Sequence, residues 1–321
     1  MLKCRICQNE QGNELVHLTG TMYGTRGNFD YFLCAECGCL QIVEEPQNLS
    51  EFYDNSRYYS FNMDRRKIRN DLLYSQMKHQ LKGHSILGAL VQWIYPVDYR
   101  YLSLVSYEDH ILDVGCGDGE LIRWMIRAGY QNVLGIDPFL SDNVTYQGKV
   151  IALKGDISEY QFDKNQKFRM VTMIHSFEHV YNQREVLQGI DNILENDGYL
   201  VIQLPGLSKY YWKKYGKCLY TLDPPRHQYI HTKSSLDVLM REMNYELVSY
   251  GTEIDVAIPK MAENLKKDQV EKNQGTSFVS GTIVSLLSKP LRRRLKREDD
   301  GAIITAVYQK KHDTEVKQKG Q

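Results

Sequence analysis

Short apolar runs alternate with amphipathic stretches through the middle of the chain, from residue 108 to residue 250. The run over residues 168–174 is apolar at nearly every position, as expected of a strand that is covered on both faces. We expect strands over residues 110–114, 133–137, 150–156, 168–174, 199–205 and 246–250. Helical spacing follows several of these runs, so the pattern predicts a doubly wound α/β sheet with ligands at the carboxyl ends of its strands.

Helical patterns also lie on either side of these strands. Residues 183–194 read as a helix followed by a turn at 196–198, and Thr232 is a suitable N-cap for a helix over 233–243. Before the α/β region, residues 65–81 and 86–94 have helical spacing. We expect these two helices to pack at the edge of the sheet, where Tyr99 and Tyr101 belong either to the core or to a lid.

A glycine-rich turn follows the first of these strands. Its glycines have the spacing G-x-G-x-G, and they are Gly115, Gly117 and Gly119. A dinucleotide site would instead have G-x-G-x-x-G beside a pyrophosphate, which the carboxylates of Asp113, Asp118 and Glu120 would repel. These carboxylates favour a cationic ligand such as S-adenosylmethionine. The alternative is a glycine turn without a ligand.

The stretch Ile111–Glu120 resembles motif I of the class I S-adenosylmethionine-dependent methyltransferases. The resemblance implies a seven-stranded, Rossmann-like methyltransferase sheet, in which residues 246–250 and 301–309 form an antiparallel edge pair. Asp137 ends the second strand, where a carboxylate can accept hydrogen bonds from the ribose hydroxyls. The family also places an adenine contact at Asp156 or at the backbone beside it, here Ile157.

Four of the seven cysteines form two C-x-x-C pairs before residue 45, namely Cys4, Cys7, Cys34 and Cys37. Two such knuckles provide four thiolates for a tetrahedral zinc ion, and a closed set of this kind is structural. The alternative is a group of buried reduced cysteines. Paired spacing and the absence of an apolar leader favour a reducing, cytoplasmic setting. The zero net charge indicates no nucleic-acid partner.

The zinc-ribbon start resembles a bacterial group of methyltransferases that often act in surface-polysaccharide or antibiotic-sugar pathways. The resemblance implies a saccharide or other small-molecule acceptor. We expect O-methylation, because the Glu-Asn-His-Tyr signature of the sugar C-methyltransferases is absent. Quinone or secondary-metabolite methylation is an alternative, as is a non-catalytic module that only binds the cofactor.

Four histidines near the ends of the fourth and fifth strands are the candidate bases for an oxygen acceptor, namely His175, His179, His227 and His231. We favour His179 or His175, then His227, and Arg226 serves either the substrate or a structural ion pair. The Glu178-His179 pair is similar to one in ubiquinone-type methyltransferases, where further acidic residues can hold a metal. Those acidic residues are missing here, so we expect no metal at this pair.

These features divide the chain into a zinc ribbon (1–45), a helical linker and cofactor lid (46–107), a methyltransferase domain (108–310) and a disordered tail (311–321). Within 254–299, an apolar stretch precedes a basic one, and 278–297 together have the character of an amphipathic basic element. We expect either a peripheral contact with the inner membrane face through this element or simple packing on the domain.

Overall fold

The computed structural model describes residues 2–47 apart from 21, 23, 24 and 26, then 49–52, 67–94 apart from 84, 97–266 apart from 164 and 256, and 289–311. Its strands are β1 (Glu14–Thr19), β2 (Asn28–Leu33), β3 (Leu40–Ile42), β4 (His110–Val114), β5 (Asn132–Asp137), β6 (Val144–Tyr146), β7 (Lys149–Lys154), β8 (Phe168–Ile174), β9 (Leu194–Pro205), β10 (Tyr229–Ile230), β11 (Tyr245–Glu253) and β12 (Ile303–Lys310). Its α-helices are α1 (Lys67–Lys82), α2 (Ile86–Ile94), α3 (Glu120–Ala128), α4 (Gln183–Ile193), α5 (Lys209–Tyr215), α6 (Lys233–Glu242), α7 (Ile258–Lys266) and α9 (Lys289–Arg297). Short 3-10 helices are η1 (Leu49–Phe52), η3 (Arg100–Leu104), η4 (Phe177–His179), η5 (Gly216–Cys218) and η6 (Tyr220–Leu222).

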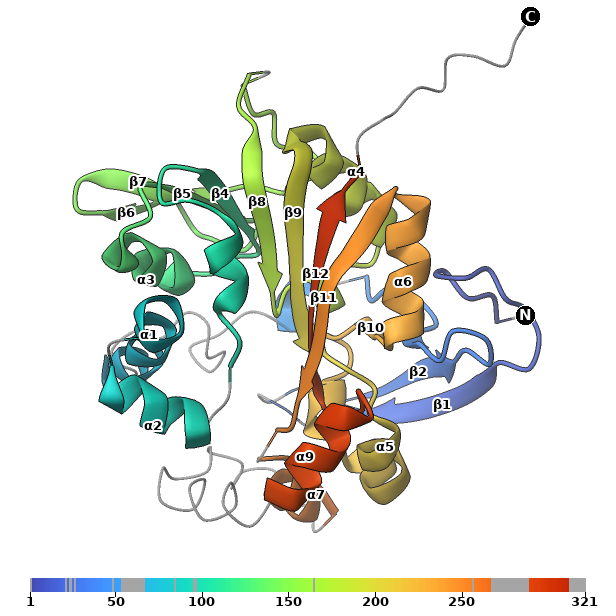
Figure 1. Ribbon diagram of the computed structural model, residues 1–321. Helices are drawn as coiled ribbons and strands as arrows, with labels where there is room; N and C mark the ends of the chain where they lie inside the picture. The colour runs from blue at the N-terminus through green and yellow to red at the C-terminus, as the bar shows by residue number, and fades with distance from the viewer. Residues whose placement is uncertain are drawn as a thin grey trace, which may run out of the picture.

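The main sheet is mixed and has the strand order β11-β12-β9-β8-β4-β5-β7-β6 (Figure 1). Its centre is parallel, and β12 lies antiparallel to both β9 and β11. The predicted strands and the antiparallel edge pair are confirmed. The sequence analysis did not predict β6, a three-residue strand that adds an eighth member at the far edge.

Helices cover both faces of this sheet. On one face α4 and α6 pack against the sheet through residues such as Leu187 and Leu239. On the other face lie α1, η3 and α3, and here Tyr99 and Tyr101 are buried in the core rather than placed as an open lid. Thr232 caps α6 as predicted: its Oγ1 accepts from the Ser235 N–H, and its own N–H donates to Ser235 Oγ.

One predicted turn takes a different form. Residues 196–198 lie inside β9, which begins directly after α4 at Leu194. The partner in β9 changes from Leu194 at Phe168 to Tyr199 at Met170, so five residues of β9 oppose two of β8 and the extra residues bulge from the ladder. Asp197 has a φ of 60°, which a turn residue of this type tolerates.

A second, antiparallel sheet lies near the N-terminus, with the order β1-β2-β3-β10 (Figure 1). Its fourth strand comes from Tyr229–Ile230, far along the chain, which pairs with β3. The interior behind this sheet is shared with α5, α7 and α9, and Leu295 of α9 is fully buried there. The small sheet and the segment after β9 therefore form one packed unit.

The described part of the basic element is α9, and residues 278–288 lie outside the described residues. Among its charges, Lys296 pairs with Glu253 and Arg294 with Glu298. Among the described residues, no helix has the length and apolar character needed to span a bilayer. Residues 312–321, where the tail was expected to be disordered, are also outside the described residues.

Candidate active site

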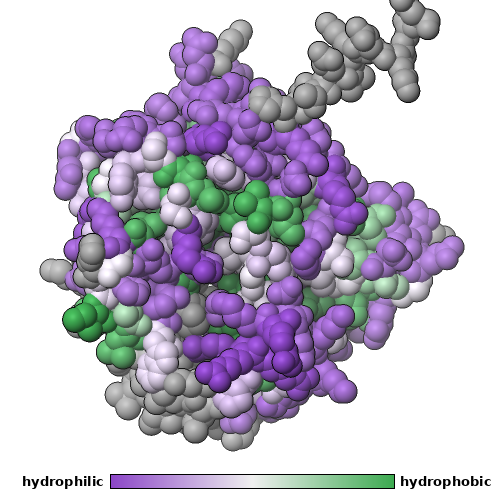
Figure 2. Space-filling view, in the orientation of Figure 1, coloured by the Kyte–Doolittle hydropathy of each residue, from purple (hydrophilic) through white to green (hydrophobic). Residues whose placement is uncertain are grey.

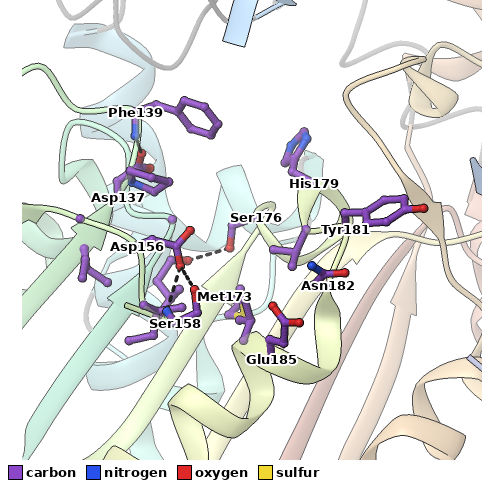
Figure 3. Close-up of a pocket in the computed structure, with 18 of the residues that line it drawn as sticks. Asp137, Phe139, Asp156, Ser158, Met173, Ser176, His179, Tyr181, Asn182 and Glu185 are labelled. Atoms are coloured by element: carbon purple, nitrogen blue, oxygen red, sulfur yellow. Dashed lines mark hydrogen bonds between the residues drawn. The ribbon is translucent and has the colours of Figure 1, made fainter. Parts of the chain in front are cut away.

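A cavity of about 330 Å³ opens at the carboxyl ends of β4, β5, β7 and β8. Figure 3 shows Asp137 and Phe139 on one side of it, and His179 and Tyr181 on the other. A cavity of this volume is within the usual range for small-molecule sites. Its position is the one that the alternation of strands and helices predicted.

The glycine loop forms one wall of this cavity. Gly115 has a φ of 74°, and a side chain there would bring its Cβ to 2.3 Å from the Cβ of Ser176. Only glycine satisfies both the left-handed backbone and this close approach of the loop after β8. Gly117 is also left-handed, with a φ of 54°, and its N–H donates to Asp137 Oδ2 over 2.8 Å.

Asp137 ends β5 and lines the cavity. Its second oxygen, Oδ1, accepts a 2.8 Å hydrogen bond from the N–H of Phe139. Burial raises the pKa of this carboxyl above its ordinary value, although the two backbone N–H groups oppose that shift. Each oxygen retains a lone pair that a hydroxyl-bearing ligand could use.

Asp156 and Ile157 follow β7 and line the same cavity. The Oδ1 atom of Asp156 accepts from the N–H and the hydroxyl of Ser158, at 2.8 and 2.6 Å, which holds this turn (Figure 3). Ile157 is buried and adds an apolar wall. The structure thus brings together Gly115, Gly117, Asp137, Asp156 and Ile157 around one space.

Two other predicted cofactor residues lie beside the cavity rather than on its wall. Asp113 is buried beneath the loop, where its Oδ1 accepts from the Thr172 hydroxyl over 2.7 Å. Burial, together with the charge of Asp137, raises the pKa of Asp113 to about 7, despite that hydrogen bond. Gly119 is left-handed and forms the N-cap of α3, so its place in the loop is structural.

Three of the candidate histidines gather around one buried carboxylate. His175 and His179 line the cavity, and His227 packs against His179 with ring centroids 4.7 Å apart. The carboxylate is that of Glu178, which is fully buried in η4. All three histidines were predicted from the sequence, whereas the position of Glu178 among them was not.

Backbone carbonyls fix the orientation of two of these rings. His179 Nδ1 lies 2.9 Å from the Arg226 oxygen, and His227 Nδ1 lies 2.8 Å from the Thr221 oxygen. A carbonyl only accepts hydrogen bonds, so in each neutral ring the proton is on Nδ1. Burial lowers the pKa of His179 to about 4 although Glu178 opposes the shift, so the ring is neutral at pH 7.

The remaining histidine and Arg226 have structural surroundings. His231 is fully buried, with Nδ1 2.9 Å from the Ser235 hydroxyl and its ring stacked on Phe177. Arg226 pairs with Asp223 through both Nε and Nη2, and it also donates to Thr25 Oγ1. Of the two roles considered for Arg226, the structure therefore shows the structural ion pair.

The four predicted cysteine ligands meet at the base of the N-terminal sheet. Their Sγ atoms all lie within 4.8 Å of one another, and the pairs Cys4–Cys37 and Cys7–Cys34 are 3.7 and 3.5 Å apart. Two thiolates bound to one zinc ion at about 2.3 Å are about 3.8 Å apart in a tetrahedron. The arrangement therefore fits a tetrahedral metal. Cys39 is not part of this group.

Several cavity residues were missed by the sequence analysis. Tyr181 and Asn182 come just before α4, Glu185 lies in its first turn, and Phe139 follows two residues after Asp137. The available signal was their position in the segments that follow β5 and β8, because ligands bind beyond the carboxyl ends of strands in such sheets. Glu45, from the segment after β3, also reaches the cavity.

Comparison with known proteins agrees with this geometry. Residues 99–250 match a family described as a methyltransferase domain. Among curated proteins, the ubiquinone biosynthesis O-methyltransferase of Glaesserella parasuis serovar 5 (strain SH0165) is 30% identical over 105 residues, covering 29% of this chain and 43% of that protein. The chain thus spans less than half of the length of this relative.

Solved structures show more distant likeness. An S-adenosylmethionine-dependent methyltransferase from Archaeoglobus fulgidus has 18% identity and a TM-score of 0.43, covering 66% of this chain and 90% of that one. A possible histamine N-methyltransferase from Thermotoga maritima has 13% identity and a TM-score of 0.41, covering 83% of this chain and 97% of that one.

The mixed main sheet, with its parallel centre and antiparallel edge, has the α/β methyltransferase fold, and a separate small antiparallel sheet carries a four-cysteine cluster. Residues 99–250, which is a little under half of the chain, are similar to a methyltransferase domain.

Proposed function

We propose that this protein transfers a methyl group from S-adenosylmethionine to a hydroxyl oxygen of a small-molecule acceptor. One observation carries the proposal: the glycine loop, Asp137 and Asp156 line one face of a cavity, and His175 and His179 line another. The first group suits the adenosyl part of the cofactor, and the second suits an acceptor that must lose a proton. The family match supports the same conclusion.

In this proposal Asp137 accepts hydrogen bonds from the ribose hydroxyls, and Asp156 or the Ile157 backbone contacts the adenine. The glycine loop lets the backbone approach the cofactor closely. Methyl transfer needs the acceptor oxygen in line with the bond between sulfur and the methyl carbon, so positioning supplies much of the rate. A neutral histidine at the cavity wall, His175 or His179, takes the hydroxyl proton.

For the acceptor we propose a saccharide, with the reaction placed in surface-polysaccharide biosynthesis. This rests on the resemblance carried by the cysteine pairs. The tyrosine-rich segment after β9 gives it little support, because Tyr211 is buried and Tyr210 and Tyr215 pack around it. The O-methyltransferase relative supports oxygen as the target and makes a quinone-type or secondary-metabolite acceptor the alternative.

We further propose that Cys4, Cys7, Cys34 and Cys37 hold a structural zinc ion. The sulfur separations fit, and the ion would join the two knuckles that close the N-terminal sheet. Metal analysis of the purified protein is the direct test. We expect about one zinc per chain bound by thiolates, and a metal-free folded protein would contradict the proposal.

Calorimetric titration with S-adenosylmethionine and S-adenosylhomocysteine tests the cofactor site. Replacing Asp137 with Ala removes an acceptor for two ribose hydroxyls, and hydrogen bonds to a charged group are worth about 1.5–3 kcal/mol. We expect affinity to fall by roughly 10- to 100-fold. Exposed Asp142→Ala, also after β5, is the matched control and should bind as the unchanged protein does. Equal affinity of both variants would show that the site is misplaced.

A non-catalytic, cofactor-binding module is the rival from another class. It predicts tight binding of the cofactor without turnover on any acceptor. Incubation with methyl-labelled cofactor and pools of nucleotide sugars or phenolic quinone precursors distinguishes the two. Label transferred to a sugar pool supports the saccharide proposal, label in the phenolic pool supports the alternative acceptor, and binding without any transfer supports the module.

A further inference from the structure

The carboxylate of Glu178 has unusual surroundings. The residue is fully buried, and neither Oε1 nor Oε2 has a hydrogen-bond partner among the described residues. A buried ionised carboxylate without hydrogen bonds costs several kcal/mol unless an opposite charge compensates it. No lysine or arginine of the described chain pairs with it; the groups that face it are imidazoles.

The distances from Glu178 to the nearby imidazoles are too long for direct hydrogen bonds, but they fit side chains that bind the same metal ion. His179 Nε2 and His227 Nε2 each lie 3.9 Å from Glu178 Oε1, beyond the hydrogen-bond range of about 2.7–3.2 Å. Two ligands at about 2.1 Å from one metal ion are at most about 4.2 Å apart. One ligand atom from each of the three residues lies within 4.8 Å of the other two.

The ring orientation points to the same conclusion. Because Nδ1 of His179 and of His227 each donates to a backbone carbonyl, both Nε2 atoms present lone pairs on the side of Glu178. Metal-binding histidines commonly have this second contact, which fixes the ring and its tautomer. The carbonyls belong to Arg226 and Thr221, in the segment after β9, so the orientation does not depend on the cavity being filled.

We propose that Glu178, His179 and His227 form a binding site for one divalent transition-metal ion beside the cofactor cavity. Two imidazoles and one carboxylate suit zinc, iron(II), cobalt(II) or nickel(II) better than magnesium or calcium. His175 Nδ1, at 3.7 Å from Glu178 Oε1, lies on the open side toward the cavity. From the sequence we expected no metal at the Glu178-His179 pair, because the further acidic residues are missing there; His227 comes from a separate segment.

A role for the ion in the reaction rests on the proposed function, whereas the site itself does not. His179 lines the cavity, so an ion held there would meet the acceptor hydroxyl and favour its ionised form. His179 and His227 would then act as ligands, which leaves His175 as the residue that receives the proton. This assigns different roles to the three candidate histidines.

Cobalt(II) titration of metal-free protein tests the site without any methyl transfer. Thiolate-bound cobalt has strong sulfur-to-metal charge-transfer absorption, whereas a site of two imidazoles and one carboxylate has only weaker d–d bands. We expect two equivalents to bind, one with each signature. Glu178→Gln and His227→Gln should each lower the affinity for the second cobalt ion by more than about tenfold. Both variants should leave the thiolate absorption band unchanged, which shows that the fold is intact.

Exposed His110→Gln, at the start of β4, is the matched control and should retain both equivalents. The proposal is overturned if the unchanged protein binds cobalt only with the thiolate signature. It is also overturned if the second equivalent persists in both the Glu178 and the His227 variants. Calorimetry with S-adenosylhomocysteine on the unchanged protein separates the two proposals, because absence of cofactor binding there would contradict the proposed function and not the metal site.

Discussion

Arg226 shows how one side chain joins distant parts of this protein. It is fully buried, and its guanidinium pairs with Asp223 and donates to Thr25 Oγ1 and to the carbonyl oxygens of Met22 and Phe52. Its own carbonyl oxygen accepts from His179. A residue that sequence analysis considered for substrate binding therefore connects the N-terminal segment to the histidine cluster.

Replacing Arg226 with Met should leave the Asp223 carboxylate buried without its partner. Breaking a buried pair in this way costs about 3–5 kcal/mol, so we expect the free energy of unfolding in urea to fall by that amount. The matched control is Arg294→Met, which removes the exposed, helical pair with Glu298 and should cost about 0–1 kcal/mol. Similar, small losses in both variants would contradict the structural role.

His231 predicts a pH dependence of stability. Burial lowers its pKa to about 3, below the ordinary 6.5, although Glu178 opposes the shift. The unfolded chain then binds a proton that the folded chain does not, so stability is complete above pH 6.5 and declines as the pH falls from 6.5 toward 3. At pH 5 the loss through this residue is roughly 2 kcal/mol.

Urea unfolding of the unchanged protein and of His231→Gln at pH 7.5 and pH 5 checks this prediction. The variant should lose about 2 kcal/mol less between the two pH values, because glutamine does not titrate. Exposed His110→Gln should keep the full dependence. An unchanged dependence in the His231 variant would mean that this ring is protonated in the folded protein.

At the scale of elements, the sequence predicted most of what local pattern determines. Apolar runs located β4, β5, β7 and β8, and the Thr232 cap located α6, because burial and capping act on neighbours in the chain. It did not predict β10, which is two residues long and exists only because β3 offers a free edge. The meeting of His227 with Glu178 was missed for the same reason, since tertiary packing brings those segments together.

The N-terminal sheet and the segment after β9 should lose their structure together when the zinc proposed at the cysteine cluster is removed. Thr232 donates to the Cys37 carbonyl oxygen over 2.6 Å, and Tyr31 donates to the His227 carbonyl oxygen over 2.7 Å. Chelation should therefore increase amide hydrogen exchange in β1–β3 and also in residues 227–231. Mass spectrometry of peptides reports both, and β5 with α3 serves as the internal control.

If exchange rose only in β1–β3, the two segments would be independent, and the shared sheet would contribute little to their stability. The same outcome would mean that metal removal at the cysteine cluster does not affect the segment that carries His227.

At the scale of the whole molecule, an apolar surface and a basic surface lie together. Ile86, Leu87, Leu90 and Trp93 of α2 are exposed, and Arg292 of α9 donates to the Trp93 carbonyl oxygen over 3.0 Å. Figure 2 shows hydrophobic side chains over α2 and strongly hydrophilic ones over α9. This combination agrees with the expectation of a peripheral membrane contact, which stays a prediction.

Co-sedimentation with vesicles of anionic and of neutral lipid tests that contact. Each basic residue near an anionic surface contributes about 1 kcal/mol, so Arg293→Gln with Arg297→Gln should weaken binding by about 30-fold. Lys149→Gln with Arg241→Gln removes the same charge at exposed positions away from α9 and should have little effect. An equal loss of vesicle binding in both double variants would indicate general charge attraction. If the unchanged protein did not bind anionic vesicles, the predicted membrane contact would be wrong.

The contribution of Tyr229–Ile230 to the N-terminal sheet has a consequence for the order of events during synthesis. The cysteine pairs and the first three strands leave the ribosome early, but their fourth strand is made only after the chain has grown past residue 230. At about 5–20 residues per second, the unfinished sheet waits on the order of 10–40 s. During that time the β3 edge is unpaired and open to pairing with strands of other chains, so the growing chain is exposed to aggregation until Tyr229–Ile230 covers that edge.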